Sequence, residues 1–98
     1  MSEQTDIQVT VAVIETAQPA RLMKTLCTHW GHKFPVEVSE QLGSIELPLG
    51  ICRMTCTDSL KVELHSDAEQ MATLQQVVAD HLQRMGSTET LVINWQTA

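Results

Sequence analysis

The sequence predicts an α+β fold, a two-layer sandwich in which two helices cover one face of an antiparallel sheet. Short segments in which apolar and polar residues alternate are typical of strands. Two longer segments repeat their apolar residues at helical spacing, so each helix needs an apolar surface to cover. The elements follow the order β, α, three or four β, α, β, which suits a sheet of about five strands with both helices on one side. Ferredoxin-like and TATA-binding-protein-like arrangements both fit this order.

The first strand is predicted over residues 7–14, IQVTVAVI, where side chains alternate between two faces. One face carries Ile7, Val9, Val11 and Val13. The second face carries Ala12 and Ile14 and is therefore not fully polar. Together with Val92 on the last strand, these two residues predict an exposed sheet face that suits a homodimer contact.

The first helix is predicted between Thr16, a candidate N-cap, and Gly31, a residue typical of helix ends. Pro19 fits the first turn because its missing N–H needs no partner there. The apolar face of this helix consists of Leu22, Met23, Leu26, Cys27 and Trp30. We expect this face to pack on the sheet.

Four segments between the helices have strand patterns: residues 36–38, 44–49, 51–57 and 60–65. Turns are expected at residues 41–43, at Gly50 and at Asp58-Ser59. The strand that contains Pro48 should lie at an edge or end there, because proline donates no ladder hydrogen bond. Cys52 and Cys56 share one strand face roughly 13 Å apart, which predicts core packing rather than a shared ion.

The second helix is predicted to begin at a capping box, Ser66 to Glu69, and to end near Gly86. Its apolar face carries Met71, Leu74, Val78, Leu82 and Met85. A last strand is predicted over residues 90–96, with Leu91, Ile93 and Trp95 on one face. We expect a single domain, residues 1–98, in which residues 1–6 are flexible.

Charge and composition exclude several function classes. Twelve acidic residues against six basic ones give a formal net charge of −6, which argues against nucleic acid and against an anionic membrane surface as partners. No apolar run has the length of a membrane span, and the polar, acidic N-terminus is unlike a secretory signal. Three cysteines, an odd number, suit a reducing compartment. We therefore expect a cytoplasmic protein.

The unusual chemistry is concentrated between Cys27 and Phe34, a segment that holds two of the four histidines. His29 and His32 are three residues apart, so a helix would let them share one metal ion. His81 lies on the apolar face of the second helix and would face this segment if the two helices are neighbours. The predicted metal ligands are therefore His29, His32 and His81. The alternative is that these histidines flank a helix end or hydrogen-bond inside the core.

Two cations are candidates for holding an anionic ligand. Lys33 follows His32, and Arg53 lies on the strand face opposite Cys52, although a solvated surface charge is the simpler explanation for both. Trp30 offers a flat surface to a ligand. The candidate ligand-binding residues are His29, Trp30, His32, Lys33 and His81. Standard catalytic signatures (GxSxG, the P-loop, GxGxxG and HExxH) are absent from the sequence.

Four stretches, LCTHWGHKFPVEV, GICRMTC, LQQVVADHLQRM and VINWQ, resemble the bacterial domain of unknown function family twenty-two-eighteen. The resemblance runs from about Val11 to Trp95 and implies a small cytoplasmic protein with no established activity. Some relatives resemble domains linked to flavin-dependent siderophore-interacting proteins. This implies a role in iron or siderophore handling, with such a reductase as partner. The resemblance marks His29, Trp30, His32, Lys33, Phe34 and His81 as signature positions without giving them roles.

Three functions follow as hypotheses. The first is a binding or accessory protein, not an enzyme, whose ligand is a divalent metal, a ferric chelate or an anionic small molecule. The second is a small-molecule enzyme with His29 or His32 as general acid or base, since histidine exchanges protons near neutral pH. The third is a structural module that forms homodimers. A concave, partly apolar pocket beside the histidines would favour the enzyme.

Overall fold

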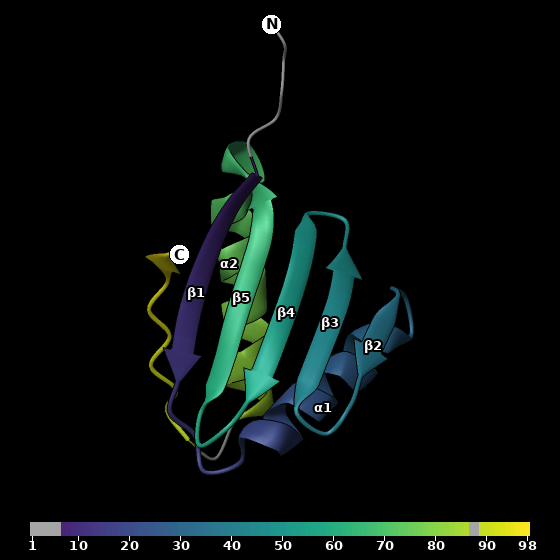
Figure 1. Ribbon diagram of the computed structural model, residues 1–98, viewed down its shortest axis with the longest axis vertical. Coiled ribbons are helices and arrows are strands. Elements are labelled where there is room, and N and C mark those ends of the chain that lie inside the picture. Colours follow the sequence, from purple (N-terminus) through teal and green to yellow (C-terminus); the bar gives the residue numbers. More distant parts are fainter. Residues whose placement is uncertain (1–6, 87–88) are drawn as a thin grey trace, which may run out of the picture.

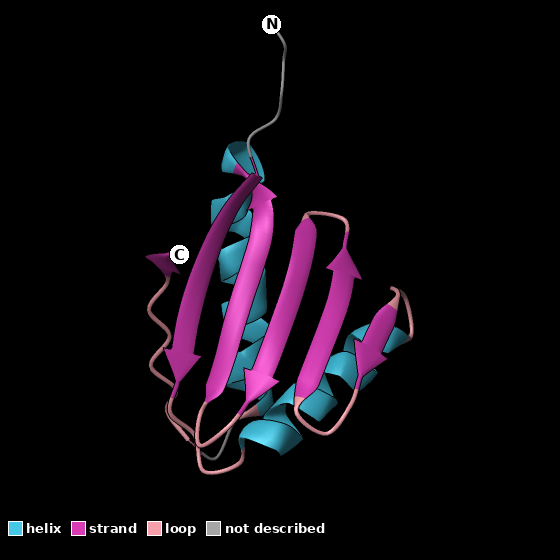
Figure 2. Ribbon diagram, viewed as in Figure 1, coloured by secondary structure: helices cyan, strands magenta, loops and turns pink. Residues whose placement is uncertain are grey.

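The computed structural model describes residues 7–86 and 89–98, so the predicted flexibility of residues 1–6 lies outside the described part. The elements are β1 (Ile7–Ile14), α1 (Pro19–Gly31), β2 (Val36–Val38), β3 (Leu42–Leu47), β4 (Gly50–Cys56), β5 (Leu60–Asp67), α2 (Ala68–Met85) and β6 (Gln96–Thr97). The six strands form one antiparallel sheet, and both helices cover the same face of it (Figure 1, Figure 2). The predicted α+β sandwich is confirmed, with one strand more than expected.

The strand order is β2-β3-β4-β5-β1-β6. The four strands β2 to β5 form one meander, and β1 pairs with β5, its last strand. A ferredoxin-like sheet would instead interleave the strands of two βαβ halves, so the order corresponds to the TATA-binding-protein-like alternative. From the end of β1, α1 crosses beneath the sheet to reach β2 at the far edge (Figure 1). α2 packs under β5, β4 and β1 and meets α1 there.

The segment just before α1 is hydrogen-bonded to Glu89, which follows α2 in the chain. Pro19 lies in the first turn as predicted, but the N-cap is Gln18, which makes no side-chain cap, so the prediction that Thr16 caps the helix is wrong. Thr16, the predicted N-cap, accepts a hydrogen bond from the backbone N–H of Gln18 at 3.3 Å and donates one to Oε2 of Glu89 at 2.8 Å. The five apolar residues predicted for the inner face of α1 are all buried.

α2 is capped by Asp67, one residue after the predicted cap. Oδ1 of Asp67 accepts a hydrogen bond from the backbone N–H of Gln70 at 2.9 Å. Ser66 still belongs to β5, where it is buried and donates to the carbonyl oxygen of Leu49 at 2.6 Å. The strand therefore continues directly into the helix, and the prediction that Ser66 opens a capping box is wrong.

β1 turns Ala12 and Ile14 towards the helices, so the prediction that this face is exposed is wrong. Their exposed fractions are 1% and 0%. Thr10, on the same face, donates to Sδ of Met71 at 3.4 Å and accepts from Nε2 of Gln75 at 3.1 Å. The open face carries Ile7, Val9, Val11 and Val13. Because Ala12 and Ile14 are core residues, they give no support to a homodimer contact.

β3 begins at Leu42, inside the predicted turn, and its second residue, Gly43, packs against α1. Gly43 pairs with Met54 in the sheet. A Cβ built on Gly43 would lie 3.1 Å from both Sγ of Cys27 and Sδ of Met23. The glycine at this position therefore allows the helix to approach the strand closely.

The last strand is shorter than predicted. Only Gln96 and Thr97 pair with β1. Leu91, Ile93 and Trp95, which precede β6, nevertheless pack against the core. The prediction identified the packed face but not the absence of strand pairing in this segment. Val92 lies outside any strand and is 66% exposed.

Candidate functional site

His29 of α1 and His81 of α2 lie next to each other where the two helices meet. Their ring centroids are 5.3 Å apart and the ring planes are inclined by 50°. The indole centroid of Trp30 lies 4.6 Å from that of His81 and 6.3 Å from that of His29. Trp30 is buried, His81 is half-buried and His29 is exposed. The fold thus assembles one cluster from these three predicted site residues.

His81 is oriented by its own helix. Its Nδ1 lies 2.8 Å from the carbonyl oxygen of Val77. A carbonyl oxygen only accepts hydrogen bonds, so Nδ1 carries the proton and donates it. In the neutral ring, Nε2 then has a free lone pair. Histidines that ligate metals are commonly held in this way, with one ring nitrogen bonded to a carbonyl group and the other directed at the metal.

His32 and Lys33 lie beyond the end of α1 and are exposed. The helix ends in a tight turn, in which the carbonyl oxygen of Trp30 accepts hydrogen bonds from the backbone N–H groups of Lys33 and Phe34. Within residues 7–86 and 89–98, no three His, Cys, Asp or Glu side chains are grouped so that they could hold a metal ion. Of the three predicted metal ligands, the structure therefore pairs His29 with His81 and does not add His32 to them.

An open hollow lies beside His29. Its volume is about 680 Å³, and it is lined by Ala20, Arg21, Lys24, Thr25, Thr28, His29 and Met85. The lining contains two cations and no carboxylate. In the part of the chain that the structure describes, no carboxylate forms a salt bridge with a lysine or an arginine, so neither cation of the hollow is paired there. The hollow therefore presents positive charge to an anion.

Arg21 and Lys24 are candidate site residues that the sequence pattern did not indicate. Charged residues on the exposed face of an amphipathic helix are usually only solvated, so nothing distinguished these two. A usable signal was their spacing relative to Thr28 and His29. Residues 21, 24, 25, 28 and 29 follow one another at helical spacing and share one face of α1.

The three cysteines are core residues. All are buried and free. Burial raises the pKa of each thiol, that of Cys52 to about 12 with a smaller contribution from Cys27. A thiol must lose its proton to act as a nucleophile or to ligate a metal. Sγ of Cys56 donates to Sδ of Met23 at 3.5 Å. The prediction of core packing for Cys52 and Cys56 is confirmed.

A family model described as "Uncharacterized protein conserved in bacteria (DUF2218)" matches residues 11–96. The chain belongs to this family. The resemblance seen in the sequence is thereby confirmed, and the match includes every residue of the histidine cluster and of the hollow.

A solved structure resembles this DUF2218 protein in sequence and in fold. The "NMR structure of PA4090 from Pseudomonas aeruginosa" is 35% identical to it, and the alignment covers 91% of this chain and 95% of that one with a TM-score of 0.72. No curated protein matches the chain. Neither the family description nor the name of the solved structure states a ligand or a reaction.

Both helices of this DUF2218 protein are short or polar relative to a membrane span. None of the helices within the described residues is long and apolar enough to cross a membrane. Both helices are instead amphipathic and bury one face against the sheet.

Proposed function

We propose that this DUF2218 protein is a non-catalytic binding protein that takes an anionic metal chelate where α1 meets α2. The observation that carries the proposal is the pairing of His29 with His81. The hollow that adjoins His29, with Arg21 and Lys24 in its lining, supports an anionic rather than a neutral chelate.

The two imidazoles form the metal half of the proposed site. Imidazole nitrogen suits zinc, copper, nickel and iron, at metal–nitrogen distances of about 2.0–2.1 Å. Ring centroids 5.3 Å apart are close enough for one nitrogen of each ring to reach a common ion after small side-chain rotations. His81 already has a free lone pair on Nε2, and the exposed His29 has room to rotate. Two protein ligands leave coordination positions for a second molecule.

The hollow forms the anion half of the proposed site. Arg21 and Lys24 lie on the same face of α1 as His29, so an organic anion bound to the metal would extend over positive charge.

A ferric siderophore belongs to this class of ligand. Through the family resemblance, a siderophore-interacting reductase is the partner that the proposal implies. A cytoplasmic location is part of the same proposal, because the three free thiols suit a reducing compartment.

Catalysis is the less favoured function. A general acid or base has to reach the substrate within hydrogen-bond distance, and such sites commonly exclude water. The hollow beside His29 is open to solvent and is not the concave pocket that would favour an enzyme, and His32 is exposed beyond the helix end. Binding a charged chelate at an open surface requires ligating and cationic groups but no exclusion of water.

Calorimetric titration with nickel(II), alone and with citrate as a model anionic chelator, tests the proposal. We expect nickel to bind the wild-type protein and citrate to strengthen the binding. His29→Ala and His81→Gln should each weaken nickel binding by about tenfold or more, which corresponds to about 1.4 kcal/mol. Equal affinity in the wild type and in His29→Ala would overturn the proposal.

Two further variants separate the halves of the site. His65→Ala is the matched control for the loss of a histidine, because His65 lies on β5 and pairs with Glu63. Its nickel affinity should equal that of the wild type. Arg21→Gln should reduce the contribution of citrate and leave the binding of nickel alone unchanged. Loss of nickel binding in His65→Ala would place the metal elsewhere.

A further inference from the structure

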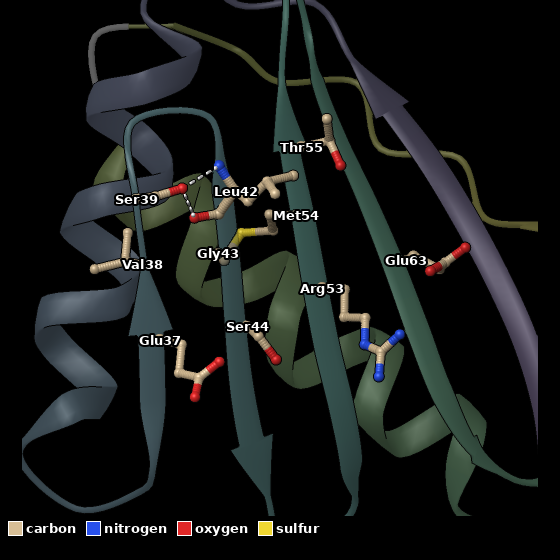
Figure 3. Close-up of a pocket in the computed structure, with 10 residues that line it drawn as sticks. All are labelled: Glu37, Val38, Ser39, Leu42, Gly43, Ser44, Arg53, Met54, Thr55 and Glu63. Carbon is tan, nitrogen blue, oxygen red and sulfur yellow. Dashed lines mark hydrogen bonds between the residues drawn. The ribbon is translucent and has the colours of Figure 1, made fainter.

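We infer that the open face of the sheet, opposite the helices, carries a second site, which binds an α-amino acid with an apolar side chain. This site goes beyond the proposed function and shares no residue with it. A pocket of about 420 Å³ lies over β2, β3, β4 and β5 (Figure 3). Its volume is in the range of small-molecule sites. The ligand class follows from the residues that line its two ends.

Strand register places four polar residues in one row across the pocket. Glu37 of β2 is opposite Ser44 of β3, Ser44 is opposite Arg53 of β4, and Arg53 is opposite Glu63 of β5. Directly opposed residues of a sheet project to the same face. Figure 3 shows the carboxylate of Glu37, the hydroxyl of Ser44 and the guanidinium of Arg53 along one end of the pocket. Neighbouring strands are about 4.8 Å apart, so the long side chains of Glu37 and Arg53, with Ser44 between them, can act on one small molecule.

The charged groups of Arg53 and Glu37 are available to bind a ligand. The carboxylate of Glu63 is hydrogen-bonded to His65, whose Nε2 lies 3.1 Å from Oε1 of Glu63. Among the residues that the structure describes, no carboxylate forms a salt bridge with a lysine or an arginine, so Arg53 and Glu37 have no charged partner there. Arg53 offers hydrogen-bond donors only, and the Glu37 carboxylate offers acceptors only. The polar end of the pocket therefore has one unpaired cation, Arg53, and one unpaired carboxylate, Glu37, beside the hydrogen-bonded carboxylate of Glu63.

The other end of the pocket is apolar. Leu42 is opposite Thr55 in the sheet, two residues from the polar row, and therefore on the same face. Leu42 is 58% exposed and Val38, at the sheet edge, is 49% exposed. Figure 3 shows Leu42 and Thr55 at the end away from Glu37 and Arg53. Covering such exposed apolar surface with the apolar part of a ligand removes it from water and therefore favours binding.

This combination favours a zwitterion with an apolar substituent. A simple anion would meet one cation and two carboxylates in the lining. A simple cation would leave the guanidinium of Arg53 without a partner. An α-amino acid carries a carboxylate for Arg53, an ammonium group for Glu37 and a side chain for the surface at Leu42. Arginine suits this role because its planar group donates two parallel hydrogen bonds to a carboxylate.

An NMR titration with leucine tests the inference. We expect leucine at millimolar concentration to shift the backbone amide signals of β2, β3 and β4. Arg53→Gln and Glu37→Gln should each weaken leucine binding by about tenfold, the size expected for a charged hydrogen-bonding partner. Both positions are exposed, so these variants should fold. Lys61→Gln is the matched control, because Lys61 is a cation of the same sheet face outside the pocket lining.

Two leucine analogues separate the charges of the ligand. The carboxylic acid that lacks the amine, and the amine that lacks the carboxylate, should each bind about tenfold more weakly than leucine. If the acid without the amine binds as tightly as leucine, the zwitterion class is wrong. The absence of shifts in β2, β3 and β4 with leucine, or equal binding by the wild type and Arg53→Gln, would overturn the site.

Discussion

The imidazole rings of His29 and His81 belong to different helices, and their centroids lie 5.3 Å apart. This contact exists because α1 crosses beneath the sheet to its far edge and packs against α2, which lies under β5, β4 and β1. Trp30 packs against His81 from the same helix that carries His29. The proposed site therefore depends on the packing of the helix layer, and each binding variant needs a parallel measurement of stability.

Ile14→Ala should lower the free energy of unfolding by about 2–5 kcal/mol, because Ile14 is fully buried and its truncation leaves a cavity. Val13→Ala is the neighbouring control. It should cost less than about 1 kcal/mol, since Val13 is 56% exposed on the open face. Urea denaturation of the two variants measures the difference. Equal losses would contradict the orientation of β1.

Gly50→Ala should destabilise the protein by about 2 kcal/mol or more. Gly50 has a φ angle of +158°, and a Cβ there would overlap the carbonyl oxygen of His65. Gly31→Ala is the matched control, because a Cβ on Gly31 would meet only Val36, at 3.8 Å or more, and alanine is the better helix former. Thermal unfolding should show a lower Tm for Gly50→Ala and no loss for Gly31→Ala. A Gly50→Ala protein with wild-type Tm would contradict the close approach of β4 to β5.

Asp67→Ala should lower the free energy of unfolding by about 1 kcal/mol, because the backbone N–H of Gln70 loses its partner at the start of α2. Asp67→Asn should keep most of the stability, since an amide oxygen accepts the same hydrogen bond. Chemical denaturation of both variants distinguishes the hydrogen bond from other effects. If asparagine is as harmful as alanine, this hydrogen bond does not account for the capping.

Alkaline pH should destabilise the protein through Cys52. Burial raises the pKa of this thiol from 9.0 to about 12 in the folded state. Between these values the unfolded chain loses the thiol proton and the folded chain keeps it. The stability from this group is therefore fully present below pH 9.0 and is lost as the pH rises towards 12.

One such group contributes a slope of about 1.4 kcal/mol per pH unit. Urea denaturation at a series of pH values above 9.0 measures the slope. Cys52→Ala should reduce it by this amount, whatever the variant costs in absolute stability. A slope that the substitution leaves unchanged would show that Cys52 is not the group responsible.

Most elements of the fold could be predicted because burial patterns are local. Alternation located β4 and β5, and helical spacing located both helices. The orientation of β1 could not be predicted, since both of its faces carry apolar residues and only the helix layer decides which one is buried. Ser66 and Asp67 are both good caps. The extent of β5, which depends on its pairing with β1, decides between them.

The candidate sites depend on contacts between distant segments. The approach of His81 to His29 was predicted only for neighbouring helices, and that condition follows from the sheet order. The row of Glu37, Ser44 and Arg53 depends on strand register, which turn geometry and burial set rather than any one segment. For this reason the sequence pattern suggested Arg53 as an isolated cation and did not predict the pocket around it.

Copper(II) quenching of tryptophan fluorescence tests the central claim most directly. Trp30 and Trp95 are the two tryptophans, so a Trp95→Phe background leaves Trp30 as the reporter, 4.6 Å from the ring of His81. Copper held by His29 and His81 should quench this fluorescence saturably. We predict that His81→Gln abolishes the saturable quenching and that His65→Ala retains it. Equal quenching in the His81→Gln variant and its parent would contradict a metal site at the meeting of the two helices.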